Sequence, residues 1–172
     1  KEQVNMVIKS LKKLKDIFYF SISTDMFNRL NNFEIKSSLI NFSLLNKNFF
    51  NHIQSYGDKI FIYNGLNNNK VNYQKYGGEI YSKIQSKLNN FNFIFSSDLN
   101  LKYEDMPKIY SQCFIGLRLT QKDGNANTVQ EFQAMNIPIV HNLSDYGLKW
   151  NNIDDIIFYI EYFNLKKNNI MF

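Results

Sequence analysis

Apolar positions along the chain alternate between helical stripes and short continuous runs. Helical spacing predicts helices over residues 4–14, 34–51, 80–88, 103–112, 127–135 and 153–163. Short apolar runs predict strands over residues 16–22, 59–63, 91–95, 113–119 and 137–141. The polar, Asn-bearing stretches 23–32, 66–74 and 121–126 show neither period and indicate loops. Residues 1–15 form a leading helical segment in this interpretation, and residues 164–172 form a tail.

The strands are apolar on both faces, and helices separate most of them. This pattern is typical of a parallel sheet that is covered on both sides. We therefore expect an α/β fold, a Rossmann-like doubly wound parallel sheet of about five strands, in a single domain spanning residues 1–172. Ligands of such sheets bind at the carboxyl ends of the strands. The loops after Ile22, Tyr63, Phe95, Leu119 and His141 are accordingly where functional residues are expected.

Composition narrows the function classes. The net charge is +5, but lysine supplies nearly all of the basic residues, and Arg29 and Arg118 are the two arginines. An arginine kept in such a background suggests bidentate recognition of phosphate or carboxylate. Cys113 is the single cysteine, which excludes an internal disulfide and a cysteine-built zinc site and favours a reducing, cytoplasmic compartment. No apolar run is long enough to span a membrane, and a chain that begins at Lys1 is expected to be a segment of a longer protein.

The segment 120–140 carries the strongest chemical signal. A strand leads into a loop of small and polar residues with Gly124 inside it, and a helix and a further strand follow. Asn125, Asn127 and Thr128 are suitable N-cap residues, so a helix begins at the carboxyl edge of the sheet. Its free N–H groups and positive dipole end suit a pyrophosphate. Glu131, one turn further on, can accept hydrogen bonds from a diol such as ribose.

This segment resembles the donor-binding motif of retaining glycosyltransferases with the GT-B fold, in particular the group 1, family 4 set. Asp123 and Glu131 are eight positions apart, Gly124 follows the first acid, and Pro138 stands seven positions after Glu131. The family usually has Glu where this chain has Asp123. The similarity is specific over residues 113–140 and extends more loosely over residues 16–163.

The resemblance implies a donor-binding domain for a nucleotide diphosphate sugar, with UDP expected before GDP. It implies that Asp123 touches hydroxyls of the donor sugar and that Arg29 and Lys36 neutralise the departing diphosphate without a metal. The donor-binding residues that it implies are Arg118, Gly124, Asn125, Ala126, Asn127, Thr128 and Glu131. The loop with Ser96, Ser97 and Leu99 would hold the base. The acceptor, a sugar, lipid or protein, would be bound by an N-terminal domain of the full-length protein.

Two alternatives remain open from the sequence. A nucleotide-sugar epimerase can share this fold, although no suitable acid–base carboxylates and histidine are evident. A non-enzymatic basic module could bind nucleotides or nucleic acid, but aromatic and basic residues are not interleaved as in known RNA-binding domains. The chain has no G-x-G-x-x-G after its first strand and no phosphate-binding G-x-x-x-x-G-K-[ST], which disfavours NAD and P-loop sites. We expect no cofactor and no metal.

Overall fold

The computed structural model describes residues 2–14, 16–40, 45, 48–53, 55–66, 69–120, 123, 126–144 and 146–167. The chain divides into two compact units, Lys1–Ser43 and Leu44–Phe172, where the sequence suggested one domain. Within the described residues, no helix combines the length and the apolar character needed to cross a membrane. We describe each unit by itself.

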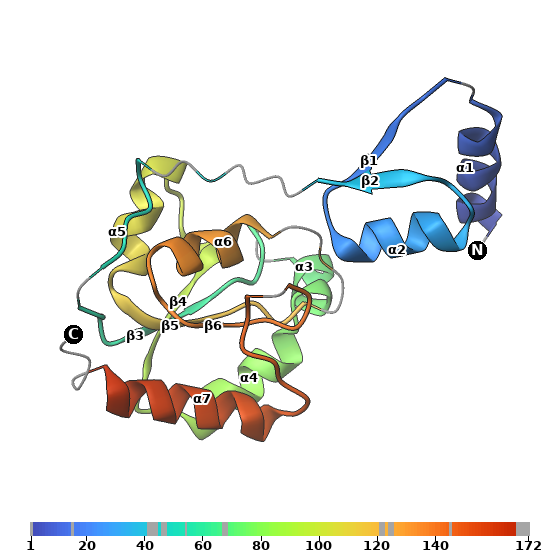
Figure 1. The fold of residues 1–172 in the computed structure, drawn as a ribbon. Helices are drawn as coiled ribbons and strands as arrows, with labels where there is room; N and C mark the ends of the chain where they lie inside the picture. The colour runs from blue at the N-terminus through green and yellow to red at the C-terminus, as the bar shows by residue number, and fades with distance from the viewer. Residues whose placement is uncertain are drawn as a thin grey trace. The chain divides into compact units, whose positions relative to one another are not determined.

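The first unit is a small βαβ arrangement preceded by a helix (Figure 1). It contains α1 (Glu2–Lys13), β1 (Tyr19–Ser21), α2 (Thr24–Asn32) and β2 (Ser37–Leu39), and the two strands pair in parallel. The loop expected over residues 23–32 is wrong, because this segment is α2. The side chain of Ser23 accepts a hydrogen bond from the backbone N–H of Met26 and caps the helix.

The helix expected over residues 34–51 is also wrong where the structure describes that stretch; residues 41–44, 46 and 47 lie outside the described residues. Glu34 has a positive φ of 59°, which no α-helical residue adopts, and β2 pairs with β1 directly afterwards. Ile35 is buried at the start of this stretch, and Phe50 is buried at its end. The apolar residues that follow Glu34 are spaced as in a helical stripe and also as in a short strand, and the pairing of β2 with β1 decides for the strand.

The second unit is built on a four-stranded parallel sheet in the order β4-β3-β5-β6. Its strands are β3 (Lys59–Ile62), β4 (Asn92–Phe95), β5 (Cys113–Leu117) and β6 (Ile139–Val140). Its helices are α3 (Lys70–Lys75), α4 (Gly78–Lys87), α5 (Met106–Tyr110), α6 (Asn127–Ala134) and α7 (Ile153–Lys166), with short 3-10 turns at Ser96–Asp98 and Tyr103–Asp105. The parallel α/β architecture is confirmed and is compatible with a Rossmann-like fold.

Three sequence-based expectations for this part of the chain change. Within the described residues this sheet has four strands, and a fifth is not confirmed, because the predicted first strand pairs in the other unit. The expected loop over residues 66–74 contains the start of α3, which Asn69 caps by accepting from the N–H of Asn72. The last helix continues into the expected tail as far as Lys166.

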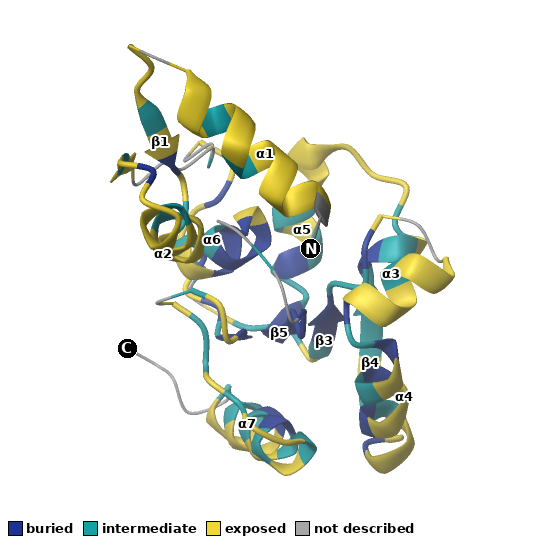
Figure 2. Ribbon diagram, turned by 90° about the vertical axis from the view of Figure 1, so that its right-hand side faces the viewer, coloured by how far each residue is buried: buried dark blue, intermediate teal, exposed yellow. Residues whose placement is uncertain are grey.

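Helices cover both faces of the four-stranded sheet (Figure 1). Helices α4 and α7 pack on one face, where Tyr81, Ile84, Ile156 and Ile160 are buried with β3 and β5 residues. Helices α5 and α6 cover the other face around Phe61. Figure 2 shows β3 and β5 as the buried centre of this unit. Burial on both faces explains why these strands are continuous apolar runs in the sequence.

The strand order reverses direction beside β3. From β3 the chain passes through α4 to β4 on one side, then crosses back through α5 to β5 on the other side, and continues outward to β6. In open parallel sheets, the gap between carboxyl ends at such a reversal is where ligands bind. In this chain it lies between the ends of β3 and β5, next to Tyr63 and Arg118.

Candidate functional site at the carboxyl edge of the sheet

Arg118 stands at the reversal point and is held on several sides. Its Nε donates to Asp123 Oδ2 at 2.5 Å, and its Nη1 donates to Thr128 Oγ1 at 3.3 Å. The guanidinium carbon lies 3.9 Å from the ring centroid of Tyr63, within the range of cation–π attraction. Only 7% of the residue is exposed. Burial lowers the pKa of Arg118, but the hydrogen bond and the charge of Asp123 more than compensate, so the group stays cationic.

Asp123 and the start of α6 meet at this edge. Asp123 is half-buried by its pairing with Arg118, and Ala126 occupies the N-cap position of α6. Within the described part of the chain, no side chain caps this helix. Asn127 is exposed and Thr128 is buried, with its hydroxyl turned toward Arg118. Of the expected donor-binding residues, Gly124 and Asn125 lie outside the described residues.

Glu131 faces inward and not toward an open edge. Its Oε2 accepts a hydrogen bond from the hydroxyl of Tyr110 at 2.7 Å, and 4% of the residue is exposed. Burial raises the pKa of Glu131, and hydrogen bonds from Tyr110 and Tyr103 offset part of that rise. A ribose hydroxyl would have to take the place of Tyr110, so the geometry favours a packing role for this carboxylate.

The two acids of the motif belong to one chain of side-chain contacts. Side-chain hydrogen bonds join Arg118 to both Asp123 and Thr128. Tyr110 in turn is hydrogen-bonded to both Thr128 and Glu131. Sequence reasoning missed Tyr110, because nothing in the sequence relates a residue of α5 to Glu131, which lies 21 positions later in α6. The network fixes Arg118 and Thr128 beside the N-terminus of α6.

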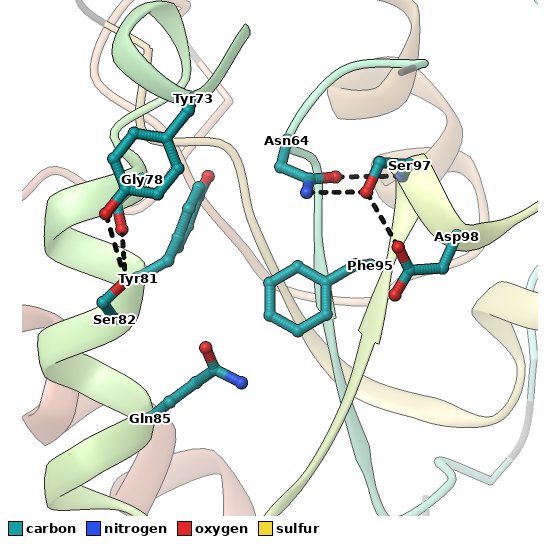
Figure 3. Close-up of a pocket in the computed structure, with 9 residues that line it drawn as sticks. All are labelled: Asn64, Tyr73, Gly78, Tyr81, Ser82, Gln85, Phe95, Ser97 and Asp98. Atoms are coloured by element: carbon teal, nitrogen blue, oxygen red, sulfur yellow. Dashed lines mark hydrogen bonds between the residues drawn. The ribbon is translucent and has the colours of Figure 1, made fainter. Parts of the chain in front are cut away.

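A pocket of about 240 Å³ opens between α4 and the carboxyl ends of β3 and β4 (Figure 3). It is lined by Asn64, Tyr73, Gly78, Tyr81, Ser82, Gln85, Phe95, Ser97 and Asp98. Of the three expected base-binding residues, Ser97 lines this pocket. Ser96 is buried with its hydroxyl 2.7 Å from the carbonyl oxygen of Gly65, and Leu99 packs against the core.

Asn64 organises the edge of this pocket. Its Nδ2 donates to Ser97 Oγ at 2.8 Å, and its Oδ1 accepts from the N–H of Ser97 at 2.9 Å. The backbone N–H of Asn64 donates to Ser96 Oγ at 3.0 Å. The sequence analysis did not single out Asn64, although an Asn-Gly pair directly after a strand is the signal that could have found it. These bonds tie the end of β3 to the turn after β4.

Arg29 and Lys36 lie in the first unit. Arg29 is exposed in the last turn of α2, where its Nη1 lies 3.6 Å from Asp25 Oδ2. Lys36 is exposed just before β2. The other described residues of the expected site lie in the second unit. The phosphate roles of Arg29 and Lys36 stay predictions, and the site described here does not include them.

Among the described side chains, no three or more His, Cys, Asp or Glu residues gather as a metal ion would require. The chain was also compared with known proteins in three ways. No family model, no curated protein and no solved structure matches it.

Proposed function

We propose that the carboxyl edge of the second unit binds a nucleotide diphosphate sugar, UDP- or GDP-linked, as the donor-binding part of a retaining glycosyltransferase. The observation that carries this proposal is the reversal of strand order between β3 and β5. A pocket flanks the reversal on the β4 side, and the N-terminus of α6 flanks it on the β5 side. A ligand that has a planar ring at one end and an anionic group next to it suits this arrangement.

The pocket between α4 and β4 suits the base. Its volume of about 240 Å³ is below the roughly 300–1,000 Å³ of complete small-molecule sites, so it suits one part of a larger ligand. Phe95 and Tyr73 provide aromatic walls for a planar ring, and Gln85 and Ser97 provide hydrogen-bonding groups. Asp98, exposed on the turn beside Ser97, offers a carboxylate near the mouth of the pocket.

The N-terminus of α6 suits the diphosphate. Backbone N–H groups and the positive end of the helix dipole attract an anion there. The charge of Arg118 is offset by Asp123, so Arg118 serves mainly to hold that carboxylate in place. In this proposal Asp123 accepts from hydroxyls of the donor sugar, as the resemblance implies.

The proposed reaction breaks the bond between the anomeric carbon of the sugar and a phosphate oxygen. The departing diphosphate takes the electron pair, and the N–H groups at α6 stabilise its charge. The hydroxyl oxygen of the acceptor then bonds the anomeric carbon and passes its proton to an oxygen of the departing diphosphate. Because the acceptor attacks on the same face from which the diphosphate leaves, configuration is retained. Because the acceptor is expected to be bound by a further domain, this chain should bind donor and transfer sugar poorly.

Titration calorimetry with UDP- and GDP-sugars tests the proposal. Gln85→Phe places a ring in the pocket and should weaken nucleotide-sugar binding at least about tenfold, which is about 1.4 kcal/mol. Ser86→Phe is the matched control, because Ser86 is exposed on the same helix and does not line the pocket. Absence of binding to both donor classes, or equal binding by the two variants, would refute the proposal.

A further inference from the structure

His141 directly follows β6 at the same carboxyl edge, and its tautomer is fixed by a backbone contact. Its Nδ1 lies 3.0 Å from the carbonyl oxygen of Arg118. A carbonyl oxygen only accepts hydrogen bonds, so Nδ1 must carry the hydrogen. Burial lowers the pKa of His141, which keeps the ring neutral. The other ring nitrogen, Nε2, therefore presents a lone pair and no hydrogen.

That lone pair has no partner among the described residues. The residue is fully buried, and Nε2 is one of the few buried side-chain atoms there without a hydrogen bond. An unsatisfied buried polar atom costs roughly 1–3 kcal/mol, and such atoms are uncommon in folded proteins. Lys149 does not fill the position, because its Nζ bonds backbone carbonyl oxygens of Asn142 and Ser144. Nε2 is thus a buried hydrogen-bond acceptor to which no group among the described residues donates.

The chemistry of the lone pair selects the part of a ligand that can fill this position. Phosphate oxygens of a diphosphate are acceptors and would be repelled by Nε2. A hydroxyl is neutral and donates, so it fits. The imidazole ring has no exposed surface, so a ligand hydroxyl reaches Nε2 only by displacing the atoms that now cover the ring.

The order of the strands points to the same part of the ligand. The proposed base pocket lies at β4 and β3, the N-terminus of α6 follows β5, and His141 follows β6. Neighbouring strands are about 4.8 Å apart, so three steps from β4 to β6 span about 14 Å. A nucleotide sugar laid along this edge has its base at one end and its sugar at the other.

We propose that His141 Nε2 accepts a hydrogen bond from a hydroxyl of the donor sugar, and thereby distinguishes a nucleotide sugar from the free nucleotide diphosphate. This inference rests on the proposed function and adds a sugar-recognising residue to it. The observation that carries it is a buried imidazole with a fixed Nδ1–H and an unpaired Nε2 at the β6 end of the edge.

Two substitutions distinguish the role of Nδ1 from the role of Nε2. In His141→Asn, the amide NH₂ can still donate to the carbonyl of Arg118, but no atom remains at the Nε2 position. In His141→Gln, the longer side chain reaches the Nε2 position with an acceptor oxygen. Calorimetry should show that His141→Asn weakens binding of the UDP-sugar roughly three- to tenfold and leaves binding of UDP within about twofold, a loss typical of one hydrogen bond. His141→Gln should recover part of it.

Nitrogen-15 NMR of the wild-type imidazoles gives a readout that does not depend on a variant folding. The Nε2 signal of His141 should shift when the UDP-sugar is added and stay in place when UDP is added. His52, the second histidine and an exposed one, is the internal control. If nucleotides bind, but His141→Asn binds the UDP-sugar as tightly as the wild type and the Nε2 signal does not shift when the UDP-sugar is added, this inference fails and the proposed function stands. If neither UDP nor a UDP- or GDP-sugar binds, both fail.

Discussion

The buried ion pair between Arg118 and Asp123 makes a quantitative prediction for stability. The two side chains are 9% and 14% exposed, and their atoms approach to 2.5 Å. Removing one partner of a buried pair leaves an uncompensated charge and costs about 3–5 kcal/mol. Small domains have about 5–15 kcal/mol of stability in total. Asp123→Ala should therefore remove about a fifth or more of the free energy of unfolding of the second unit.

A double-mutant cycle isolates this effect. In the double variant Arg118→Met with Asp123→Ala, no charge remains, so the loss should be at least about 2 kcal/mol smaller than the sum of the two single losses. Urea denaturation followed by tryptophan fluorescence measures each free energy of unfolding. Trp150 is the single tryptophan and lies in the second unit, so the signal reports the part of the chain that holds the pair.

The exposed pair of Lys87 and Asp154 serves as the control. Their atoms lie 3.1 Å apart, but the side chains are 56% and 84% exposed. Exposed pairs contribute about 0–1 kcal/mol and weaken with salt. If the coupling in the cycle of Arg118 and Asp123 is no larger than in this control cycle, burial does not give the pair its strength and the reasoning is refuted.

Three further predictions follow from single buried groups. Burial raises the pKa of Glu131 above its ordinary value of 4.5, so the stability it contributes is complete below pH 4.5 and is lost as pH rises through the raised pKa. Glu131→Gln should therefore gain stability relative to the wild type from pH 4.5 upward in urea denaturation, and a difference that is flat with pH would contradict this. Burial raises the pKa of the Cys113 thiol to about 12, so this thiol should react with a disulfide reagent only after unfolding, and rapid labelling of the folded chain would contradict it. In Gly116→Ala, the new Cβ would lie 2.5 Å from Phe132 Cε1, so calorimetric unfolding should show a loss of about 1–3 kcal/mol, and an unchanged melting temperature would refute the contact.

Local pattern was sufficient for most of the second unit. The apolar runs around residues 59–63, 91–95, 113–119 and 137–141 each contain an observed strand, because a strand buried on both faces must be apolar throughout. The segment around residues 127–135 was likewise found as a helix. In the first unit the same reasoning failed: the capping signal of Ser23 was overlooked, and the stretch after Glu34 fits a helical stripe and a short strand equally well.

The sequence by itself determined that this chain has a parallel α/β sheet with polar residues where its strands end, because apolar spacing and strand-end chemistry are properties of neighbouring residues. Only the tertiary structure decided which strand ends meet. It placed β1 outside the larger sheet, set the reversal between β3 and β5, turned Glu131 toward Tyr110, and joined Asn64 to Ser97. Each of these is a contact between residues separated by many positions, and such contacts depend on how whole elements pack.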